Sequence, residues 1–260
     1  MTPDVERYRS IALRLADVAD EVSLRHFGGD IDVQRKQDGS FVTAADKAVE
    51  RAIREGLSEL APGDAVLGEE QGGVLDADVP TWVIDPIDAT NNFLRGIPVY
   101  ATLISVVVGT TPVVGVASAP AMGERWDAAQ GKGARRNGLD VAVSDVDDLR
   151  WAQLLHGGLN WWRSGGSEWE TLGRLSDAVW RTRGFGDFWM HLLVAGGMAE
   201  VAVDRDLKPW DIAAVECIVT EAGGRMTAYD GGPPIPKGEA LSSNGRLHDA
   251  ALRVVRGAAA

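Results

Sequence analysis

Hydrophobic residues recur at helical spacing in the N-terminal part of the chain. The first stripe advances in steps of three and four residues, which predicts an amphipathic helix that ends near Gly28 and Gly29. It comprises Val5, Tyr8, Ile11, Leu15, Val18 and Val22. A second stripe predicts another helix, which Thr43 is placed to cap and Pro62 and Gly63 to end. It comprises Ala45, Val49, Ile53, Leu57 and Leu60.

Short apolar runs replace the helical stripes after this point. Residues 65–67 predict a buried strand that carries Glu69 at its end. Residues 82–84 predict a second strand. We expect that strand to be broken at Asp85 and Pro86, because proline cannot donate to a sheet ladder.

The middle of the chain is rich in strand-forming residues and turn signals. Residues 99–108 and 112–118 predict a hairpin, and the glycines and the Asn-Gly turn of residues 131–138 predict further strands. From about Val141 the pattern becomes mixed. It predicts helices over residues 172–179, 188–195 and 210–222 and a strand over residues 198–203.

This alternation of strands and helices predicts mixed α/β layers in one compact unit of two lobes. We expect the N-terminal lobe to cover residues 1–140 and the C-terminal lobe residues 141–260. Residues 157–166 are the segment in which we expect a mobile loop. Trp161 and Trp162 lie there between glycines, where they either pack over a site or fill a local core.

Composition excludes several classes of protein. The chain carries 26 Lys and Arg against 38 Asp and Glu, a net charge of −12, which argues against a nucleic-acid partner. Hydrophobic residues make up 45%, enough for a packed core. The single cysteine, Cys217, excludes an internal disulfide, and no apolar run is long enough to span a membrane. We therefore expect a cytoplasmic protein with no membrane contact.

Four acidic residues stand beside predicted strand ends or helix starts: Glu69, Asp85, Asp88 and Asp211. Taken singly, each fits a surface charge, and Asp211 fits a helix cap. Asp85 and Asp88, however, are three residues apart around a proline, and like charges held so close resist burial unless a cation neutralises them. Magnesium binds through carboxylates together with substrate phosphate, so it is the cation that this group predicts.

The segment that follows Asp88 adds groups that bind anions. Residues 89–92 offer backbone N–H groups and the hydroxyl of Thr90. If a helix begins there, its N-terminal amides form an anion site. A metal cluster beside an anion site predicts a phosphate ester as the substrate.

Four motifs, in this order, resemble those of the inositol monophosphatase-like family of metal-dependent phosphatases. They are VTAAD at 42–46, GEE at 68–70, WVIDPIDATNNF at 82–93 and WDIAA at 210–214. They span residues 42–214, most of the chain. The resemblance implies an α/β fold of the α+β kind, a layered αβαβα sandwich.

The resemblance also implies a metal centre of two to three Mg²⁺ ions. In the family, the acid that matches Glu69 binds the first and third ions, and the acid that matches Asp85 bridges the first two. The acids that match Asp88 and Asp211 hold the second ion. The backbone carbonyl that matches Ile87 completes the coordination of the first.

Catalytic and phosphate-binding roles follow from the same resemblance. Thr90 and Asp46 would orient and deprotonate the attacking water, next to the metal ligand Glu69. The amides of Ala89 and Thr90 would bind the phosphate. In-line displacement by metal-activated water needs no covalent phosphoenzyme.

Ala89 is a departure from the family, which commonly has glycine at this position. Alanine does not easily take a positive φ, and its methyl group crowds a backbone that must approach phosphate. If the turn needs that conformation, we expect a slightly altered phosphate site with intact metal ligands.

The residues around the motifs resemble the branch of the family that hydrolyses histidinol phosphate. The similarity lies in residues 92–103, 183–188 and 243–249. Histidinol phosphate carries an ammonium group and an imidazole, which an acidic pocket suits. Arg183, Asp187 and Asp204 are the candidate substrate-binding residues, although Asp187 equally fits a helix cap and Asp204 a surface turn.

Other functions stay open at this point. An inositol or aminocyclitol monophosphatase would use the same site, with Asp204 binding hydroxyl groups, and a nucleotide bisphosphatase is a weaker alternative. A non-catalytic metal-dependent scaffold protein would be expected to lack at least one metal acid, and none is missing. The resemblance also implies inhibition by lithium and a homodimer.

Overall fold

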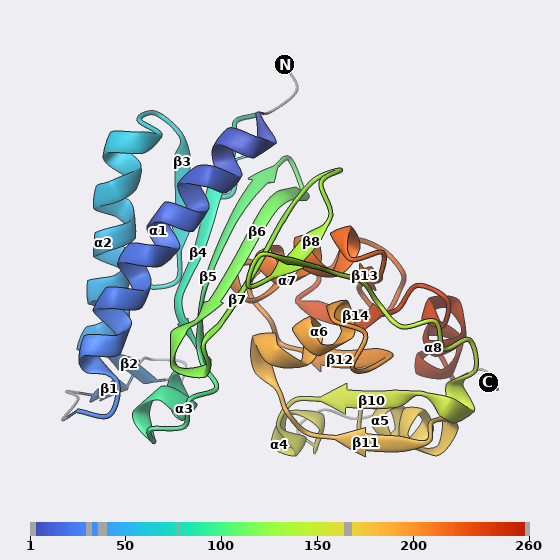
Figure 1. Ribbon diagram of the computed structural model, residues 1–260. Helices are drawn as coiled ribbons and strands as arrows, with labels where there is room; N and C mark the ends of the chain where they lie inside the picture. The colour runs from blue at the N-terminus through green and yellow to red at the C-terminus, as the bar shows by residue number, and fades with distance from the viewer. Residues whose placement is uncertain (1–3, 30–32, 36–40, 77, 164–167, 258–260) are drawn as a thin grey trace.

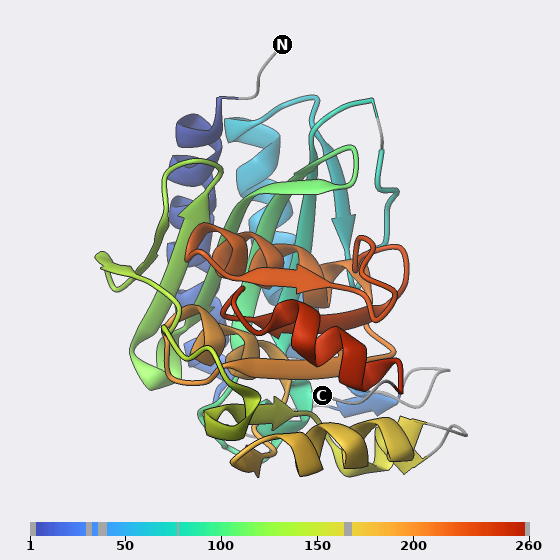
Figure 2. The same ribbon diagram turned by 90° about the vertical axis from the view of Figure 1, so that its right-hand side faces the viewer.

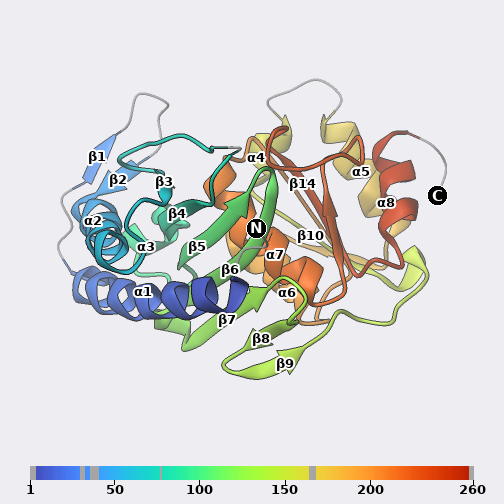
Figure 3. The same cartoon turned by 90° about the horizontal axis from the view of Figure 1, so that it is seen from above.

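The structure, a computed structural model, describes residues 4–29, 33–35, 41–76, 78–163 and 168–257. Helices and sheets alternate in five layers (Figure 1). Seen from above, the order runs from α1 and α2 through a first sheet, α6 and α7, and a second sheet to α5 and α8 (Figure 3). The predicted αβαβα sandwich is confirmed.

The outer helices α1 (Val5–His26) and α2 (Ala44–Leu60) cover one face of the first sheet. Asp4 caps α1 by accepting a hydrogen bond from the Arg7 amide. Val18, a member of the predicted apolar stripe, is 43% exposed. The buried face of α1 uses small residues in its place, and they let the helix approach the sheet closely. They are Ala12, Ala16 and Ala19.

The first sheet comprises seven strands of the described chain, in the order β3-β4-β5-β6-β7-β8-β9. They are β3 (Ala65–Gly68), β4 (Thr81–Asp88), β5 (Ala101–Val108), β6 (Thr111–Ala119), β7 (Glu124–Ala129), β8 (Ala134–Arg136) and β9 (Leu139–Val141). The hairpin of β5 and β6 is confirmed. β3 and β4 pair in parallel, and the other neighbours are antiparallel. β1 (Val33–Arg35) and β2 (Phe41–Thr43) pair antiparallel in a separate two-stranded sheet.

β4 corrects the expectation of a break at Pro86. The strand continues to Asp88, and its register against β5 shifts between Asp85 and Asp88. Such a bulge leaves a residue outside the ladder, so proline fits there although it has no N–H to donate. The Pro86 carbonyl accepts a hydrogen bond from the Thr102 hydroxyl at 2.8 Å.

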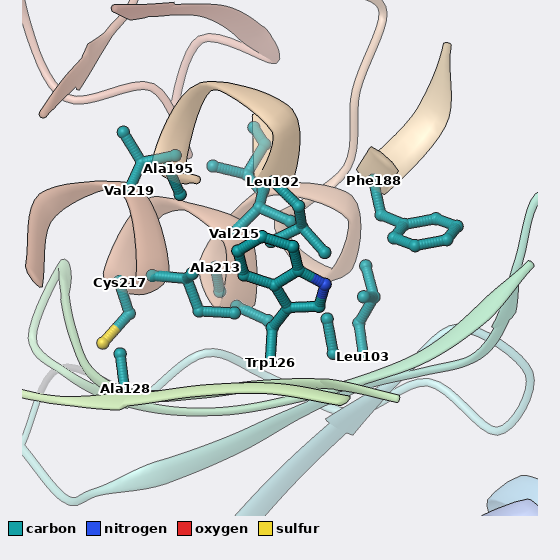
Figure 4. Packing of buried hydrophobic residues seen from close by; sticks show 14 of the residues in the cluster. Leu103, Trp126, Ala128, Phe188, Leu192, Ala195, Ala213, Val215, Cys217 and Val219 are labelled. Atoms are coloured by element: carbon teal, nitrogen blue, oxygen red, sulfur yellow. The ribbon is translucent and has the colours of Figure 1, made fainter. Parts of the chain in front are cut away.

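The middle layer consists of α6 (Asp187–Ala195) and α7 (Pro209–Glu221). In Figure 4, Leu192, Ala213 and Val215 of these helices pack around Trp126 of the first sheet. α7 approaches the sheet so closely that a Cβ atom on Gly115 would lie 2.3 Å from the Ala214 carbonyl oxygen. The apolar α7 is thereby fixed against the sheet that carries Asp85 and Asp88.

The second sheet has the order β11-β10-β12-β14-β13, and its strands cross the direction of the first sheet (Figure 2). They are β10 (Gln153–His156), β11 (Arg181–Arg183), β12 (Val201–Arg205), β13 (Arg225–Thr227) and β14 (Glu239–Ser243). The outer face is covered by α5 (Glu168–Ala178) and α8 (His248–Val255). Short helical turns flank β7 and β10, namely η1 (Pro120–Met122) and η2 (Leu149–Trp151).

Part of the segment expected to be a mobile loop is helical. Residues 159–163 form α4 (Leu159–Arg163), and Trp162 is buried against the outer face of the second sheet. Its ring stacks on Tyr229 with centroids 6.5 Å apart. Trp162 therefore fills a local core, one of the two roles considered. The side chain of Trp161 and residues 164–167 lie outside the described residues.

The two sheets come from separate parts of the sequence, residues 65–141 and 153–243. α7 contacts strands of both sheets, and α6 contacts the second sheet and reaches the first through Phe188, so the two helices join the two parts. The division into lobes at residue 140 stays a prediction. In the part of the chain that the structure describes, no helix is both long and apolar enough to cross a bilayer.

Candidate active site

Two parallel strands bring acidic residues to one edge of the first sheet. Glu69 follows β3, and Asp85 and Asp88 lie among the last four residues of β4. The Glu69 amide donates to the Ile84 carbonyl at 3.1 Å, which fixes the height of Glu69 along the sheet. Carboxyl ends of parallel strands lie at the same edge, so Glu69 comes beside the two aspartates.

The bulge in β4 gives Asp85 and Asp88 a common side. In a regular strand, residues three apart point to opposite faces. The extra residue of the bulge reverses this alternation, and the Ile87 amide donates to Asp85 Oδ1 at 3.0 Å across it. The proline motif therefore shapes the pair of carboxylates.

Asp211 reaches the same place from the first turn of α7. The Lys208 amide donates to Asp211 Oδ2 at 2.7 Å, so this carboxylate also caps the helix, as one reading of the sequence proposed. Oxygen atoms of Asp85, Asp88 and Asp211 lie within 4.8 Å of one another. All three donors are hard carboxylate oxygens, the set that a divalent cation such as Mg²⁺ requires.

The acids raise one another's pKa values. The pKa of Asp85 is raised well above its usual value by burial and then by the charges of Glu69 and Asp88. Burial raises the pKa of Asp211 to about 7, and Asp85 hydrogen-bonds to it. The pKa of Asp88 is raised by burial and by the charge of Asp187. Only a bound cation would let these groups ionise together without cost, so the residues fit a metal.

Asp46 is held next to this group by the start of α2. Its Oδ2 accepts hydrogen bonds from the Thr43 amide at 2.8 Å and hydroxyl at 2.5 Å, which confirms Thr43 as the cap. Its Oδ1 faces the Thr90 hydroxyl at 3.4 Å. The same hydroxyl lies 3.0 Å from the Ile87 carbonyl oxygen. Thr90 thus joins Asp46 to the bulge that carries the metal-ligand candidates.

Ala89 takes the backbone conformation that favours glycine. Its φ is +66°, immediately before α3 (Thr90–Leu94). The Ala89 carbonyl accepts hydrogen bonds from the Asn92 and Phe93 amides at 2.8 and 3.1 Å. The turn therefore needs a positive φ, and this chain forms it with alanine.

A second group of acids lines an adjacent cavity of about 190 Å³. Asp204 lies in β12 and is 7% exposed, so its interpretation as a surface turn is wrong. A Cβ on Gly157 would lie 3.0 Å from Asp204 Oδ1, and the glycine thus makes room for the carboxylate. Burial raises the pKa of Asp204 to about 7, with additions from the charges of Asp187 and Asp211. The charges of the metal-ligand candidates therefore act on the acids of this cavity.

Asp187 also lines the cavity but does not cap α6. The N-cap residue is Gly186, and Asp187 is the first helical residue, with φ +50°. The Phe188 amide instead donates to Asp88 Oδ2 at 2.7 Å, so Asp88 serves the helix start. Although Asp187 is exposed, the protein atoms around its carboxyl group raise its pKa to about 6.

Arg183 is not brought into this group. It is exposed at the end of β11, and its guanidinium donates to the Thr182 carbonyl at 2.7 Å. Among the described residues, the wall of the cavity comprises Gly157, Gly158, Asp187, Asp204, Arg205, Asp206 and Leu207. The arginine in this wall is thus Arg205, whose guanidinium pairs with Glu168 and Asp206, and the sequence did not indicate it.

Two groups that hold site residues in place were also missed. Glu50 accepts hydrogen bonds from the two amides that follow Glu69, and the Phe188 amide donates to Asp88. Glu50 interrupts the apolar stripe of α2 and precedes Arg54 by four residues, a spacing typical of a helical ion pair. That spacing was the available signal. No sequence signal indicates the Phe188 amide, because its partner Asp88 lies 100 residues away in the sequence.

Known proteins with similar sequences decide the family. A sequence model described as the inositol monophosphatase family matches residues 4–259.

The chain belongs to the inositol monophosphatase family.

Relatives that carry the name histidinol-phosphatase match nearly the whole chain. The protein from Mycobacterium tuberculosis is 43% identical, over 93% of this chain and 95% of its own length. The protein from Streptomyces coelicolor is 42% identical, over 96% and 97%. A solved structure of an inositol monophosphatase from Zymomonas mobilis matches with a TM-score of 0.87 at 30% identity, over 98% of this chain and 99% of its own.

These relationships confirm the family that the four motifs predicted, and they extend it beyond residues 42–214. Membership of the inositol monophosphatase family makes the chain a phosphatase, a phosphoric monoester hydrolase. A metal-dependent reaction agrees with the grouped acids.

Proposed function

We propose that the chain is a Mg²⁺-dependent histidinol-phosphatase, which converts L-histidinol phosphate and water to L-histidinol and phosphate in histidine biosynthesis. The observation that carries this proposal is the acidic cavity of Asp187 and Asp204 beside the metal-ligand candidates. Such a cavity favours a substrate with positive charge next to its phosphate. The names of the two relatives with 42 and 43% identity support the same ester.

Glu69, Asp85, Asp88 and Asp211, with the Ile87 carbonyl, would hold two to three Mg²⁺ ions. Bound Mg²⁺ supplies positive charge to the phosphate oxygens and lowers the pKa of water. Asp85 is 2% exposed, so little water competes for this donor set. Metal ligands that are buried in advance cost little reorganisation when the ions bind.

Asp46 and Thr90 are proposed to orient and deprotonate the attacking water, beside Glu69. Burial raises the pKa of Asp46 above its usual value, which makes its carboxylate a better base. Its other oxygen, Oδ1, accepts from the Thr90 hydroxyl, so a proton from water can pass through Thr90 to Asp46. The amides of Ala89 and Thr90, at the start of α3, would donate to the phosphate.

Asp204 and Asp187 are proposed to bind the ammonium and imidazole groups of histidinol. A cation in the cavity would lower the pKa values of both acids and ionise them. Arg183 was the third candidate for this role. Its exposed guanidinium would reach substrate only after leaving the Thr182 carbonyl, so we propose a peripheral role for it.

The decisive experiment compares turnover of histidinol phosphate, inositol 1-phosphate, fructose 1,6-bisphosphate and adenosine 3′,5′-bisphosphate, with Mg²⁺ and with a chelator. Histidinol phosphate should be hydrolysed fastest, and only with Mg²⁺. Asp85→Asn should lower kcat by at least about 100-fold, because it removes a charge that the metals need. An unchanged rate in this variant would refute the metal assignment.

Inositol monophosphatase is the second candidate. The solved inositol monophosphatase with a TM-score of 0.87 favours it, as does the Asp204 carboxyl, whose pKa of about 7 lets it donate or accept hydrogen bonds to hydroxyls. Asp187→Ala separates the two. It should reduce the preference for histidinol phosphate over inositol phosphate, and retention of full preference would remove the role of Asp187. A non-catalytic scaffold would hydrolyse none of the esters.

Further properties stay predictions. Lithium should inhibit at millimolar concentration if the second Mg²⁺ is weakly held, and the chain should form a homodimer in the cytoplasm. Phosphate release in lithium chloride, with potassium chloride as the control, tests the first. Sedimentation tests the second.

A further inference from the structure

The turn that carries Glu69 is fully hydrogen-bonded through its backbone. The Gly68 and Gly72 amides donate to each other's carbonyl groups, at 3.1 and 3.0 Å. The Glu69 amide donates to Ile84. The two remaining amides, of Glu70 and Gln71, donate to a side chain from another element.

That side chain is Glu50 of α2. Its Oε2 accepts from the Glu70 amide at 2.7 Å, and its Oε1 accepts from the Gln71 amide at 3.1 Å. Arg54, one helical turn later, donates from Nε to Oε1 at 2.8 Å. Arg54 also donates to the Gly72 carbonyl at 2.6 Å. Glu50 and Arg54 thus bind both ends of the turn.

The Glu50 carboxylate is buried, and Gly68 leaves space for it. The Glu50 side chain is 0% exposed, whereas that of Arg54 is 25% exposed. A Cβ on Gly68 would lie 2.2 Å from Glu50 Oε1, so glycine is required there by the carboxylate and not by its own backbone angles. Helix α2 therefore carries two acids toward the site, Asp46 in its first turn and Glu50 one turn later.

We propose that Glu50, oriented by Arg54, is the positioning residue for Glu69 as a metal ligand. This inference rests on the proposed metal role of Glu69. The Glu50 oxygens bind the two amides that follow Glu69 and so fix the turn that carries Glu69, whose charge acts on Asp85. Loss of a residue that orients a metal ligand typically weakens metal binding by about 10- to 100-fold.

The charge and both oxygens of Glu50 matter for this role. Glutamine keeps the shape but has one acceptor oxygen, so it would turn an NH₂ group toward a backbone N–H. One of the two amides would then lose its partner inside the protein, and the turn would open locally.

The first test compares Glu50→Gln with Glu55→Gln, a matched control that removes an exposed carboxylate from the same helix. Mg²⁺ binding is measured by calorimetry without substrate. The dissociation constant should rise about tenfold in Glu50→Gln and stay unchanged in the control. Amide hydrogen exchange of metal-free protein should quicken in residues 68–72 and not in α1 or the first sheet. Faster exchange everywhere would indicate general destabilisation and overturn the proposal.

A second test asks whether Glu50 acts through Glu69. Glu50→Gln in a Glu69→Gln background should weaken Mg²⁺ binding by less than twofold further, since the ligand to be positioned is already lost. Equal losses in both backgrounds would overturn the proposal.

Gly68→Ala provides a route that leaves the charges intact if Glu50→Gln folds poorly. Its methyl group displaces the Glu50 carboxylate, so Mg²⁺ binding should weaken by the same order. If wild type binds Mg²⁺ but hydrolyses none of the esters, the proposed function fails while this inference stands. If both variants bind Mg²⁺ as wild type does, the inference alone fails.

Discussion

Strained backbone is concentrated at the candidate site. In the described residues, four positions other than glycine have a positive φ: Ala89, Asn137, Asp187 and Asp206. Asp187 and Asp206 line the cavity, and Ala89 precedes the proposed phosphate amides. Aspartate tolerates this conformation, whereas alanine gains nothing from it. Strain kept at such places is typical of functional sites.

Ala89→Gly should stabilise the protein. It removes a left-handed alanine that costs about 1–2 kcal/mol, against about 0.5–1 kcal/mol for the greater freedom of glycine in the unfolded chain. We expect a net gain of up to about 1 kcal/mol, or about 2–4 °C in the midpoint of thermal unfolding.

Ala44→Gly is the control for Ala89→Gly, because Ala44 is exposed at the first position of α2 and has no positive φ. It should lower the midpoint. A loss of stability in both variants would mean that the turn at Ala89 is not strained.

Asp85→Asn should separate stability from metal binding. At pH 8 without metal, the variant replaces a carboxyl group whose ionisation is opposed by burial and by the charges of Glu69 and Asp88, while its amide oxygen can still accept from Ile87. We expect a gain on the order of 1 kcal/mol in chelator. Added Mg²⁺ should raise the midpoint of wild type only. Equal Mg²⁺ shifts in both proteins would contradict the metal assignment.

At the scale of elements, sequence periodicity predicted those helices and strands whose bounds are determined by local interactions. α2 and α7 were predicted within a residue or two, because an apolar face and a capping residue define them. β10 was missed because a buried strand of four residues has no distinguishing pattern. The bulge in β4 was read as a break because its cause is the pairing with β5. The contact of α6 with Asp88 depends on tertiary packing alone.

Gly186→Ala tests that contact. Gly186 has φ +74° and ψ 176°, a region open to glycine almost exclusively, so alanine must rotate the start of α6 and move the Phe188 amide away from Asp88. We expect a loss of about 1–3 kcal/mol in unfolding free energy and weaker Mg²⁺ binding. Chemical denaturation and calorimetry measure the two effects.

Gly173→Ala is the matched control for Gly186→Ala. Gly173 lies inside α5, and a Cβ there meets nothing within 4 Å. Alanine should stabilise this helix by about 0.5–1 kcal/mol and leave Mg²⁺ binding unchanged. If the two glycines behave alike, the backbone of Gly186 does not hold α6 in place.

At the scale of the whole molecule, the site is assembled from every inner layer. β4 supplies Asp85 and Asp88, α7 supplies Asp211, and β12 supplies Asp204. The motifs predicted the first three, because strand ends and helix starts converge in layered folds. Asp204 was also a candidate from the sequence, but its burial and the cavity depend on the second sheet, whose strands mostly escaped prediction. The result is a molecule that buries several acids, and its stability should therefore depend on pH.

Without metal, the protein should lose stability as the pH rises from 6.5 to 8. Burial raises the pKa of Asp204 to about 7 and that of Glu216 to about 8. Glu216 lies on α7, where one carboxyl oxygen is buried with no hydrogen-bond partner among the described residues. In the unfolded chain both acids release their protons near pH 4, so their contribution is full below that pH and disappears as the pH passes the folded values.

Two buried histidines make the protein lose stability as the pH falls, and they do so only at lower pH. Burial lowers the pKa of His191 to about 3 and that of His248 to about 4. Their contribution is lost as the pH falls from about 6.5, where the unfolded histidines begin to gain protons. Above pH 6.5 it is complete, so the window from 6.5 to 8 reports the acids.

Thermal unfolding in chelator at pH 6.5, 7.2 and 8.0 measures this dependence. Glu216→Gln should flatten the decline by about 1–2 kcal/mol over the window, since the folded pKa of Glu216, about 8, lies at the top of the window and Glu216 lies outside the metal-ligand group. Glu55→Gln, an exposed acid, should leave the decline as in wild type. Mg²⁺ should reduce it by holding Asp211 ionised in the folded state. Stability that stays constant over this window would mean that the buried acids are already ionised without metal.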